Sequence, residues 1–419
     1  MRLLQLWARL FVVSMLAGGV ARAFTRNGAP LWLGAASAAT IAVVGAIGGL
    51  LVIASVVRVR TMKRRLERAV AARTDMAVDT PYHAMERAFA PLVESRAARD
   101  LSAAVILPGG AVTWYPTGDP RDRASRLYEI GSLTKPLTAE LLATMITDGS
   151  VTMETTVGAI LPDVALPVSV ASITLDELVT HRSGLPRLPR SLGFRLAALF
   201  SADPYRWLTA SSLLDIFARS QRTAPAGTYS NFGFGILGYV LGKRHGADYS
   251  QALAVRLLRP LGLANTFANV DDGTAARLAR GHDLLGTPTP RWHTSAIAGA
   301  GGVCMTIADA AAWLAAHLEP DEDFRNVVRM VTQPRAPLGS GQIGMAWCIQ
   351  EANGRTFVWH NGGTGGFASF AVFEPARRVG VIVLAASAHI ASLDLAGFAA
   401  LAECAARWGQ PETTTADAV

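Results

Sequence analysis

The polar and apolar positions after Thr74 follow two different periods, which predict a mixture of strands and helices. Residues Ser102–Tyr115 form two β-rich runs around a Pro-Gly-Gly turn and therefore predict a hairpin. Further apolar runs near the C-terminus have the length and composition of consecutive strands: RTFVWH, FASFAVFE and VGVIVLAAS. Ala391–Ala406 then shows helical periodicity, and so does the earlier segment Leu133–Met145.

The middle of the chain, about 140–300, combines helical stretches such as Tyr249–Leu258 with many Gly and Pro turns. Strands at both ends around a helical middle favour one antiparallel sheet built from both ends of the chain. We therefore expect one globular domain over residues 75–410 that carries this helical insert. A flexible tail is expected over residues 411–419.

The N-terminal segment has a third kind of pattern, because residues 27–57 contain no charged side chain. Its core, residues 31–57, exceeds the roughly 20 apolar residues that a membrane-spanning helix needs. We expect residues 1–68 to be a membrane anchor with a basic flank. An earlier apolar stretch, about 10–23, admits two interpretations: a signal-like segment that ends in Ala-Arg-Ala, or a short first span.

The net charge of +7 is concentrated in this N-terminal segment. Residues 1–73 hold 11 of the 39 Lys and Arg residues and a single acid, Glu67, so the rest of the chain carries a net charge of −3. This distribution favours a lipid bilayer as a partner and argues against nucleic acid. The basic cluster from Arg58 to Arg68 follows the expected span, and the positive-inside rule then places the globular domain in the cytoplasm.

Composition and cysteine spacing exclude several other classes. With 51% hydrophobic and 17% charged residues, the chain is neither disordered nor fibrous. Cys304, Cys348 and Cys404 are widely spaced and provide neither a disulfide framework nor a zinc site. There is no G-x-S-x-G, which argues against an α/β-hydrolase. There is also no H-E-x-x-H and no complete P-loop, and we expect no metal and no cofactor.

The clearest chemical motif is Ser132-Leu133-Thr134-Lys135, an S-x-x-K at the start of the segment with helical periodicity. Residues three apart lie on one face of a helix, so the lysine amine reaches the serine hydroxyl. A helix N-terminus also favours the negative charge of a serine oxygen that loses its proton. Ser132 is therefore the candidate nucleophile and Lys135 its candidate proton acceptor.

Further motifs follow in a fixed order: HRSGLP at His181–Pro186, YSN at Tyr229–Asn231, PLGLANTF at Pro260–Phe267, AGAGGVCMTIADAAAWLAAHL at Ala298–Leu318 and WHNGGTGGFASF at Trp359–Phe370. Together with the S-x-x-K, this series resembles the β-lactamase-related serine hydrolases, which include class C β-lactamases, DD-peptidases and family VIII esterases. The resemblance covers about residues 80–405. It implies an α/β fold with a five-stranded antiparallel sheet flanked by helices, together with a mostly helical subdomain.

The resemblance also implies roles for individual residues. Ser132 matches the acylated serine, Lys135 the motif lysine, and Tyr229 the proton-shuttling tyrosine of the Y-x-N motif. Asn231 matches the substrate-binding asparagine of that motif, although its position before a helix also fits a helix cap. We expect His181 to position a loop and assign it no catalytic role.

The third motif supplies the remaining expected contacts. His360, Asn361 and Gly362 stand where the family has K-T-G or H-x-G, so His360 and Gly362 are candidate substrate-binding residues. The backbone N–H groups of Ser132 and Gly363 match the oxyanion hole. The glycines allow the strand backbone to approach an acyl group closely.

Histidine in place of lysine is the main departure from the family pattern. A neutral imidazole binds the carboxylate of a β-lactam or of D-Ala-D-Ala more weakly than an ammonium group. We therefore expect a membrane-anchored esterase or amidase acting on small-molecule, peptide or ester substrates. The alternatives are a β-lactamase or DD-carboxypeptidase, and a catalytically silent binding protein. The expected location is the inner membrane of a bacterium. The side of the membrane stays open, because the charge rule favours the cytoplasm whereas most relatives act outside it.

Overall fold

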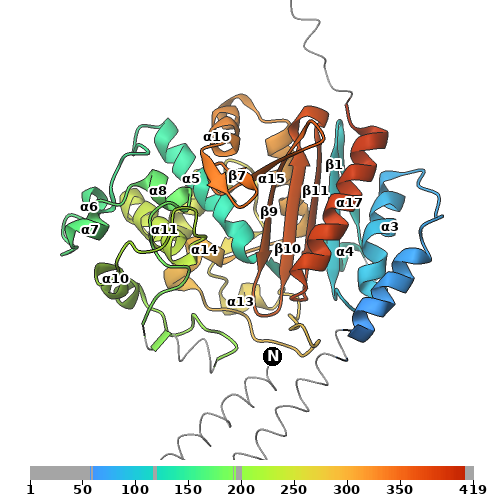
Figure 1. The fold of residues 1–419 in the computed structure, drawn as a ribbon, viewed down its shortest axis with the longest axis horizontal. Helices are drawn as coiled ribbons and strands as arrows, with labels where there is room; N and C mark the ends of the chain where they lie inside the picture. The colour runs from blue at the N-terminus through green and yellow to red at the C-terminus, as the bar shows by residue number, and fades with distance from the viewer. Residues whose placement is uncertain (1–56, 58–59, 117–119, 192, 195–200, 411–419) are drawn as a thin grey trace, which may run out of the picture.

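In this computed structural model, the described residues are 57, 60–116, 120–191, 193–194 and 201–410. The expected signal-like segment, nearly all of the expected membrane span and the expected tail lie outside them. Among the described residues, no helix is both long enough and apolar enough to cross a membrane. The first described helical segment, residues 60–71, lies beside the rest of the domain in Figure 1.

The core of the domain is an antiparallel sheet with strand order β2-β1-β11-β10-β9-β8-β7-β6. The strands are β1 (Leu101–Leu107), β2 (Gly110–Trp114), β6 (Ala336–Leu338), β7 (Gly341–Ile343), β8 (Cys348–Ala352), β9 (Arg355–Gly363), β10 (Ala368–Glu374) and β11 (Val379–Ala385). The predicted hairpin and the predicted C-terminal strands are confirmed, and both ends of the chain contribute to one sheet. The expected count of five strands is wrong, because β6, β7 and β8 extend the sheet to eight.

Tight turns connect the additional strands to one another and to β9. Asn353 and Gly354 join β8 to β9, and both have positive φ, 52° and 73°. The tight hairpin turn that Asn-Gly favours requires positive φ at both of its central residues, so the sequence alone could have predicted this turn. Gly339, with φ of 59°, lies in the turn between β6 and β7. These two strands have three residues each, too few for a period of two to stand out.

Alternate residues of the central strands pack into two separate hydrophobic cores, one on each face of the sheet. On β11, Val381 and Val383 face helices α3 (Pro81–Glu94) and α17 (Ile390–Trp408), whereas Ile382 and Leu384 face the larger core. Figure 1 shows α17 and α3 covering one side of the sheet, while α15 (Ile307–Leu318) and the helical part cover the other. This alternation is what a strand buried on both faces requires.

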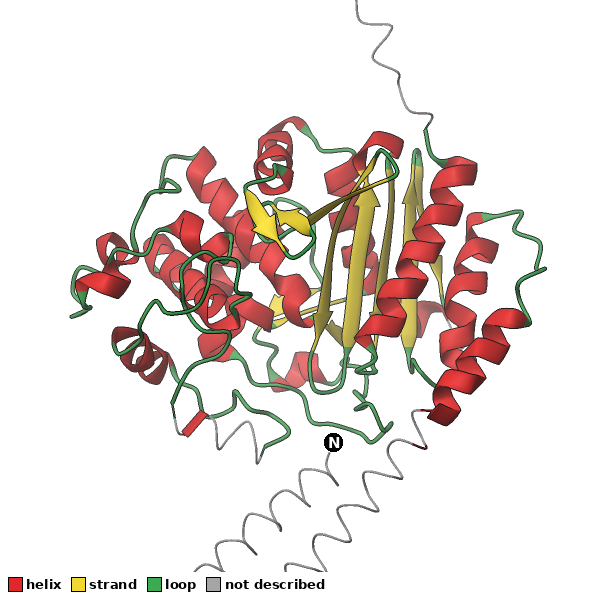
Figure 2. Ribbon diagram, in the orientation of Figure 1, coloured by secondary structure: helices red, strands yellow, loops and turns green. Residues whose placement is uncertain are grey.

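The segment between the two sets of strands is mostly helical, as Figure 2 shows. A second small sheet has the order β3-β5-β4; its strands are β3 (Tyr128–Glu129), β4 (Thr266–Ala268) and β5 (Val303–Met305). The other helices are α4 (Pro120–Ala124), α5 (Thr134–Thr147), α6 (Val157–Ile160), α7 (Val168–Ala171), α8 (Leu175–Val179), α10 (Ala210–Ala218), α11 (Asn231–His245), α12 (Tyr249–Leu253), α13 (Asp272–Ala275), α14 (Ala298–Gly301) and α16 (Glu322–Thr332). The predicted helix over Tyr249–Leu258 is α12 followed by a π-helical turn.

Helix α5 is fixed to α15 by a buried polar cluster. Trp313 Nε1 donates to Glu140 Oε2 at 2.8 Å, and His317 Nε2 lies 3.0 Å from Glu140 Oε1. The Nδ1 atom of His317 lies 2.9 Å from the Trp313 carbonyl oxygen. The Glu140 and His317 side chains are fully buried, so each polar atom in this cluster depends on its partners inside the protein.

Replacing Glu140 with leucine should therefore destabilise the fold. The change removes the acceptor of both Trp313 and His317, and breaking such a buried cluster costs about 3 kcal/mol of unfolding free energy. Urea unfolding followed by far-ultraviolet circular dichroism measures the change. Glu154→Leu, at an exposed glutamate, is the control and should stay within about 0.5 kcal/mol. Equal stability of the two variants would contradict the prediction.

Candidate active site

Ser132 lies on a turn that joins β3 to α5, in a short 3-10 helix over Gly131–Leu133. Gly131 adopts φ of +50°, and a Cβ atom there would lie 2.5 Å from the Gly363 nitrogen at the end of β9. Only glycine fits both the backbone conformation and this contact. The S-x-x-K segment and the third motif therefore meet through their backbones.

A second contact fixes the same turn to the sheet. Ser369 on β10 donates its hydroxyl to the carbonyl oxygen of Ile130 at 2.7 Å. Gly362 pairs with Ser369 across β9 and β10, and a Cβ on Gly362 would lie 1.9 Å from that same carbonyl oxygen. Gly362 thus permits close packing of the turn against β9, and it does not line the pocket beside Ser132.

Lys135 is fully buried on the first turn of α5. Its Nζ atom lies 2.9 Å from Ser132 Oγ and donates to the carbonyl oxygen of Ala300 in α14 at 2.7 Å. Burial lowers the pKa of Lys135 well below its ordinary value, and the charge of Arg187 lowers it further. A lysine with a depressed pKa is a competent proton acceptor near neutral pH.

Tyr229 completes the cluster around the serine. Its hydroxyl is hydrogen-bonded to Ser132, and burial raises its pKa above the ordinary tyrosine value. The Nζ atom of Lys135 lies 4.8 Å from the centre of the Tyr229 ring. The pKa shifts of the two residues run in opposite directions, and burial disfavours the charged form of each, the ammonium of Lys135 and the phenolate of Tyr229.

His181 holds the loop that carries Tyr229. Its Nδ1 accepts a hydrogen bond from the Ser230 N–H at 3.1 Å, and its ring centroid is 4.5 Å from that of Tyr229. Its backbone has φ of +58°, uncommon for a residue with a side chain. These contacts agree with the loop-positioning role expected from the sequence.

Asn231 is the first residue of α11, but the helix cap is Ser230, whose Oγ accepts from the Gly233 N–H at 2.9 Å. The alternative of Asn231 as a helix cap is therefore wrong. The side chain of Asn231 is hydrogen-bonded to the Tyr205 hydroxyl and lines a pocket. None of the described residues donates to its buried Oδ1, so this oxygen is placed to accept from a ligand.

The pocket beside Ser132 is small, about 30 Å³. It is lined by Gly131, Ser132, Tyr205, Asn231, Trp292, Thr294, Ile297, Ala300, Gly301 and Gly363. Ser132 and Gly363, the expected oxyanion-hole residues, thus share one cavity. Tyr205 and Trp292 were missed by the sequence analysis, because each lies in a loop without a recognisable motif.

His360 stands behind this pocket and not in its wall. It is 2% exposed, its ring centroid is 6.3 Å from that of Tyr229, and its Nδ1 lies 2.6 Å from the Asn361 carbonyl oxygen. Burial and the nearby Lys135 lower the pKa of His360 to about 3. The imidazole is consequently neutral throughout the physiological pH range.

The described residues contain no group of three or more His, Cys, Asp or Glu side chains that could hold a metal ion. The groups gathered around Ser132 Oγ are the Lys135 amine, the Tyr229 hydroxyl and the surrounding backbone. This is the arrangement of nucleophilic acyl transfer, with a nucleophile beside a base and N–H donors nearby.

Comparison with known families agrees with this chemistry. A profile of the Beta-lactamase family matches residues 85–405, which is most of the chain. The chain belongs to the Beta-lactamase family and is a serine hydrolase.

Relatives in this family have varied activities. The D-alanyl-D-alanine-carboxypeptidase/endopeptidase AmpH of Escherichia coli K12 is 28% identical over 295 residues, 64% of this chain and 73% of that protein. A β-lactamase of Escherichia coli K12 is 24% identical over 72% of this chain and 87% of its own. The unguisins hydrolase of Aspergillus campestris is 28% identical over 62% of this chain, and this match spans only about half, 52%, of the fungal protein.

Solved structures confirm the fold. A class C β-lactamase from Rhodobacter sphaeroides superposes with a TM-score of 0.64 at 20% identity, over 76% of this chain and 98% of its own. A β-lactamase from Sulfitobacter sp. EE-36 gives a TM-score of 0.66 at 20% identity, over 77% and 97%. The expected β-lactamase/transpeptidase-like α/β architecture is thus confirmed.

Proposed function

We propose that this chain hydrolyses esters and amides of small molecules or peptides through an acyl-enzyme on Ser132. The observation that carries the proposal is the fully buried Lys135 amine, 2.9 Å from Ser132 Oγ and with a strongly lowered pKa. A neutral amine accepts the Ser132 proton as the serine oxygen attacks the acyl carbon. A binding protein without catalytic activity would have no use for a buried lysine amine beside a serine hydroxyl.

The next steps use the groups around the pocket. The oxygen of the tetrahedral intermediate accepts hydrogen bonds from the N–H groups of Ser132 and Gly363. Tyr229, which is protonated, passes a proton to the leaving group and regains one through Lys135. Water then attacks the acyl-enzyme, and the products are the acid and free Ser132.

The roles of these residues are tested by substitution. Ser132→Ala and Lys135→Ala should abolish both labelling by a fluorophosphonate and hydrolysis of short p-nitrophenyl esters, with a loss of about 10⁶-fold for the serine. Tyr229→Phe should slow turnover about 10²- to 10⁴-fold. The chain offers a matched control pair, Lys243 and Tyr239, which contact each other elsewhere, with the ammonium 5.5 Å from the ring centre.

Lys243→Ala and Tyr239→Phe should retain the parent rates. Labelling of the Ser132→Ala protein would refute the assignment of the nucleophile, and a Tyr229→Phe protein with the parent rate would make Tyr229 a packing residue. Absence of labelling in the parent protein would favour the silent binding protein.

Esterase or amidase chemistry is favoured over β-lactamase or DD-carboxypeptidase activity by the state of His360. The substrates of those enzymes carry a carboxylate beside the scissile amide, and a permanent cation in the third motif would bind it. The buried His360, with a pKa of about 3, supplies no such cation. Peptidase activity is the second candidate, because relatives such as AmpH are named as carboxypeptidases.

The substrate prediction follows from this neutral imidazole. We expect kcat/KM for a short-chain p-nitrophenyl ester to exceed that for nitrocefin or benzylpenicillin by at least about tenfold, or roughly 1.4 kcal/mol. Because His360 takes up a proton only near pH 3, the ratio should stay constant between about pH 5 and pH 8. His360→Lys should lower the ratio of kcat/KM for the ester to kcat/KM for the β-lactam. His360→Gln, which stays neutral, is the control for this variant. Faster turnover of penicillins than of esters at pH 7.5 would replace the esterase proposal with the β-lactamase one.

Membrane attachment is the second part of the proposal. It is supported by the uncharged residues 27–57 and by the basic residues that follow them. In the helical segment 60–71, Lys63, Arg64 and Arg65 are exposed, while Leu66 and Met62 pack on the domain. An exposed basic face next to an apolar segment suits the anionic surface of a bilayer.

The charge rule gives a prediction for orientation. A green fluorescent protein fused after Val419 should fluoresce, and an alkaline phosphatase fused there should stay inactive, because the basic flank keeps the domain in the cytoplasm. The same fusions to a chain that lacks residues 1–59 serve as cytoplasmic controls. An active phosphatase fusion would place the hydrolase domain outside, where most relatives of this family act.

A further inference from the structure

Arg187 is placed beside the catalytic cluster by its backbone. Its carbonyl oxygen accepts hydrogen bonds from the N–H groups of Asn231 and Phe232, at 3.0 and 3.3 Å. Its guanidinium carbon lies 5.1 Å from the centre of the Tyr229 ring, the same ring that Lys135 approaches to 4.8 Å. Arg187 and Lys135 therefore both lie against the Tyr229 ring.

The charge of Arg187 is open to solvent. The side chain is exposed, and no carboxylate among the described residues lies within ion-pair distance of it. Its neighbours behave differently: Arg182 pairs with Asp176, and Arg222 pairs with Glu177. An exposed arginine without an acidic partner, held against a catalytic tyrosine, is placed to bind an anionic ligand.

The other basic groups near Ser132 cannot take this role. Lys135 is buried and donates to Ala300, and His360 is neutral because burial holds its pKa at about 3. The charge of Arg187 also reaches the site, since it contributes to the lowered pKa values of Lys135 and His181. Arg187 therefore supplies the positive potential that the third motif lacks.

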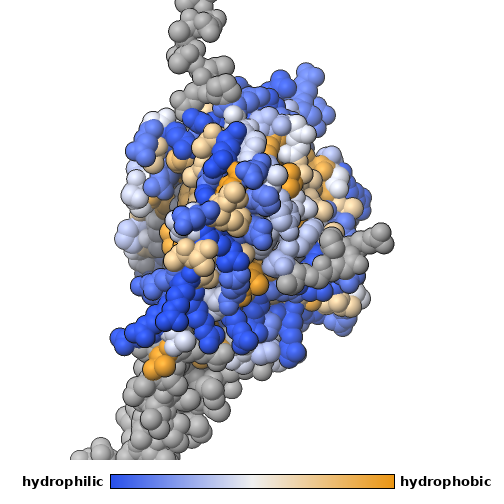
Figure 3. Space-filling view, turned by 90° about the vertical axis from the view of Figure 1, so that its right-hand side faces the viewer, coloured by the Kyte–Doolittle hydropathy of each residue, from blue (hydrophilic) through white to orange (hydrophobic). Residues whose placement is uncertain are grey.

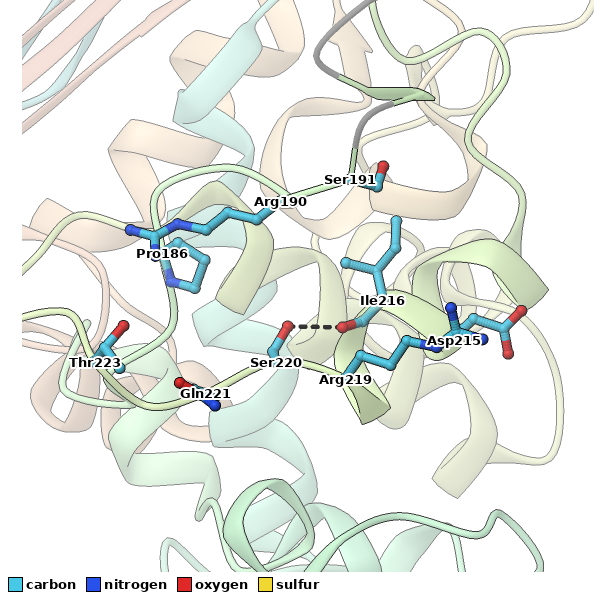
Figure 4. Close-up of a pocket in the computed structure, with 9 residues that line it drawn as sticks. All are labelled: Pro186, Arg190, Ser191, Asp215, Ile216, Arg219, Ser220, Gln221 and Thr223. Atoms are coloured by element: carbon cyan, nitrogen blue, oxygen red, sulfur yellow. Dashed lines mark hydrogen bonds between the residues drawn. The ribbon is translucent and has the colours of Figure 1, made fainter.

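A larger cavity, about 460 Å³, opens on the same loop. It is lined by Pro186, the residue before Arg187, and by Arg190, Ser191, Asp215, Ile216, Arg219, Ser220, Gln221 and Thr223. Figure 4 shows Arg190 beside Pro186, and Arg219 beside Ile216 and Asp215. The lining holds two arginines against one acid, so this cavity, which Arg187 adjoins in sequence without lining it, also favours a negative charge.

We propose that Arg187 binds a carboxylate carried by the acyl part of the substrate, several bonds from the acyl carbon. Arg187 contacts the Tyr229 ring and is not in the wall of the pocket at Ser132. This placement favours a carboxylate at the end of a longer acyl chain, as in the monoester of a dicarboxylic acid, over one that adjoins the scissile bond, as in a β-lactam. This inference rests on the proposed function. The bond between the acyl carbon and the alcohol oxygen breaks, Ser132 Oγ takes the acyl group, and the alcohol leaves with the serine proton. Water then releases the dicarboxylic acid and restores the hydroxyl of Ser132.

The test compares two substrates that share the scissile p-nitrophenyl ester and differ at the far end, where one has a carboxylate and the other a neutral methyl ester: mono-p-nitrophenyl adipate and its methyl ester. The full-length protein should prefer the anionic substrate in kcat/KM, and the preference should fall as salt is raised, because the arginine is exposed. Arg187→Gln should lower the ratio of the two kcat/KM values about tenfold or more, and Arg187→Lys should restore part of it. The ratio cancels any effect of Arg187 on the pKa of Lys135, which alters both substrates alike.

Arg259→Gln is the control, because Arg259 is an exposed arginine at the end of the π-helical turn, outside the site. It should leave the ratio unchanged. An unchanged ratio in Arg187→Gln, with both esters hydrolysed through Ser132, would overturn this inference and leave the proposed function intact. Failure of the parent protein to hydrolyse either ester would instead reject the proposed function.

Discussion

Removal of water from the Lys135 amine is the constraint on which the rest of the site depends. A lysine in water holds its proton at neutral pH and cannot activate a serine. Here the amine is enclosed, with the Ser132 hydroxyl and the Ala300 carbonyl as its hydrogen-bond partners. Each element around it keeps solvent away: α5 carries it, α14 supplies the carbonyl, and Tyr229 covers it. The fold therefore sets the chemistry by deciding where a charge cannot be hydrated.

The same enclosure explains why the backbones approach so closely around the serine. Gly131, Gly362 and Gly363 lie where a side chain would meet main-chain atoms or a neighbouring side chain. A larger residue at Gly131 or Gly362 would push β9 away from the turn that carries Ser132. Glycine at these positions therefore keeps the third motif in contact with that turn.

Much of this architecture was predictable from local pattern. The hairpin of β1 and β2, the strands β9 to β11 and the helix α17 all follow from periods that a single segment shows. The 2.9 Å contact between Ser132 and Lys135 was predictable for the same reason, since the two residues lie three positions apart at the start of one helical segment. By contrast, β6 and β7 are too short to carry a period, and Ser230 rather than Asn231 caps α11. Tyr205, Trp292 and Arg187 reach the site only through tertiary packing, which no spacing within one segment encodes.

The hydrogen bond from Ser369 to Ile130 also has a temporal consequence. It joins residues 239 positions apart, and Gly363 comes equally late in the chain. A ribosome makes the N-terminal part first, so Ser132 and Lys135 are synthesised long before the strands that complete their surroundings. Until β9 and β10 have been made and have joined the sheet, the turn that carries Ser132 lacks its contacts with Gly362, Gly363 and Ser369. The surroundings of the proposed nucleophile are therefore completed only near the end of synthesis, well after the helix that carries Lys135 has been made.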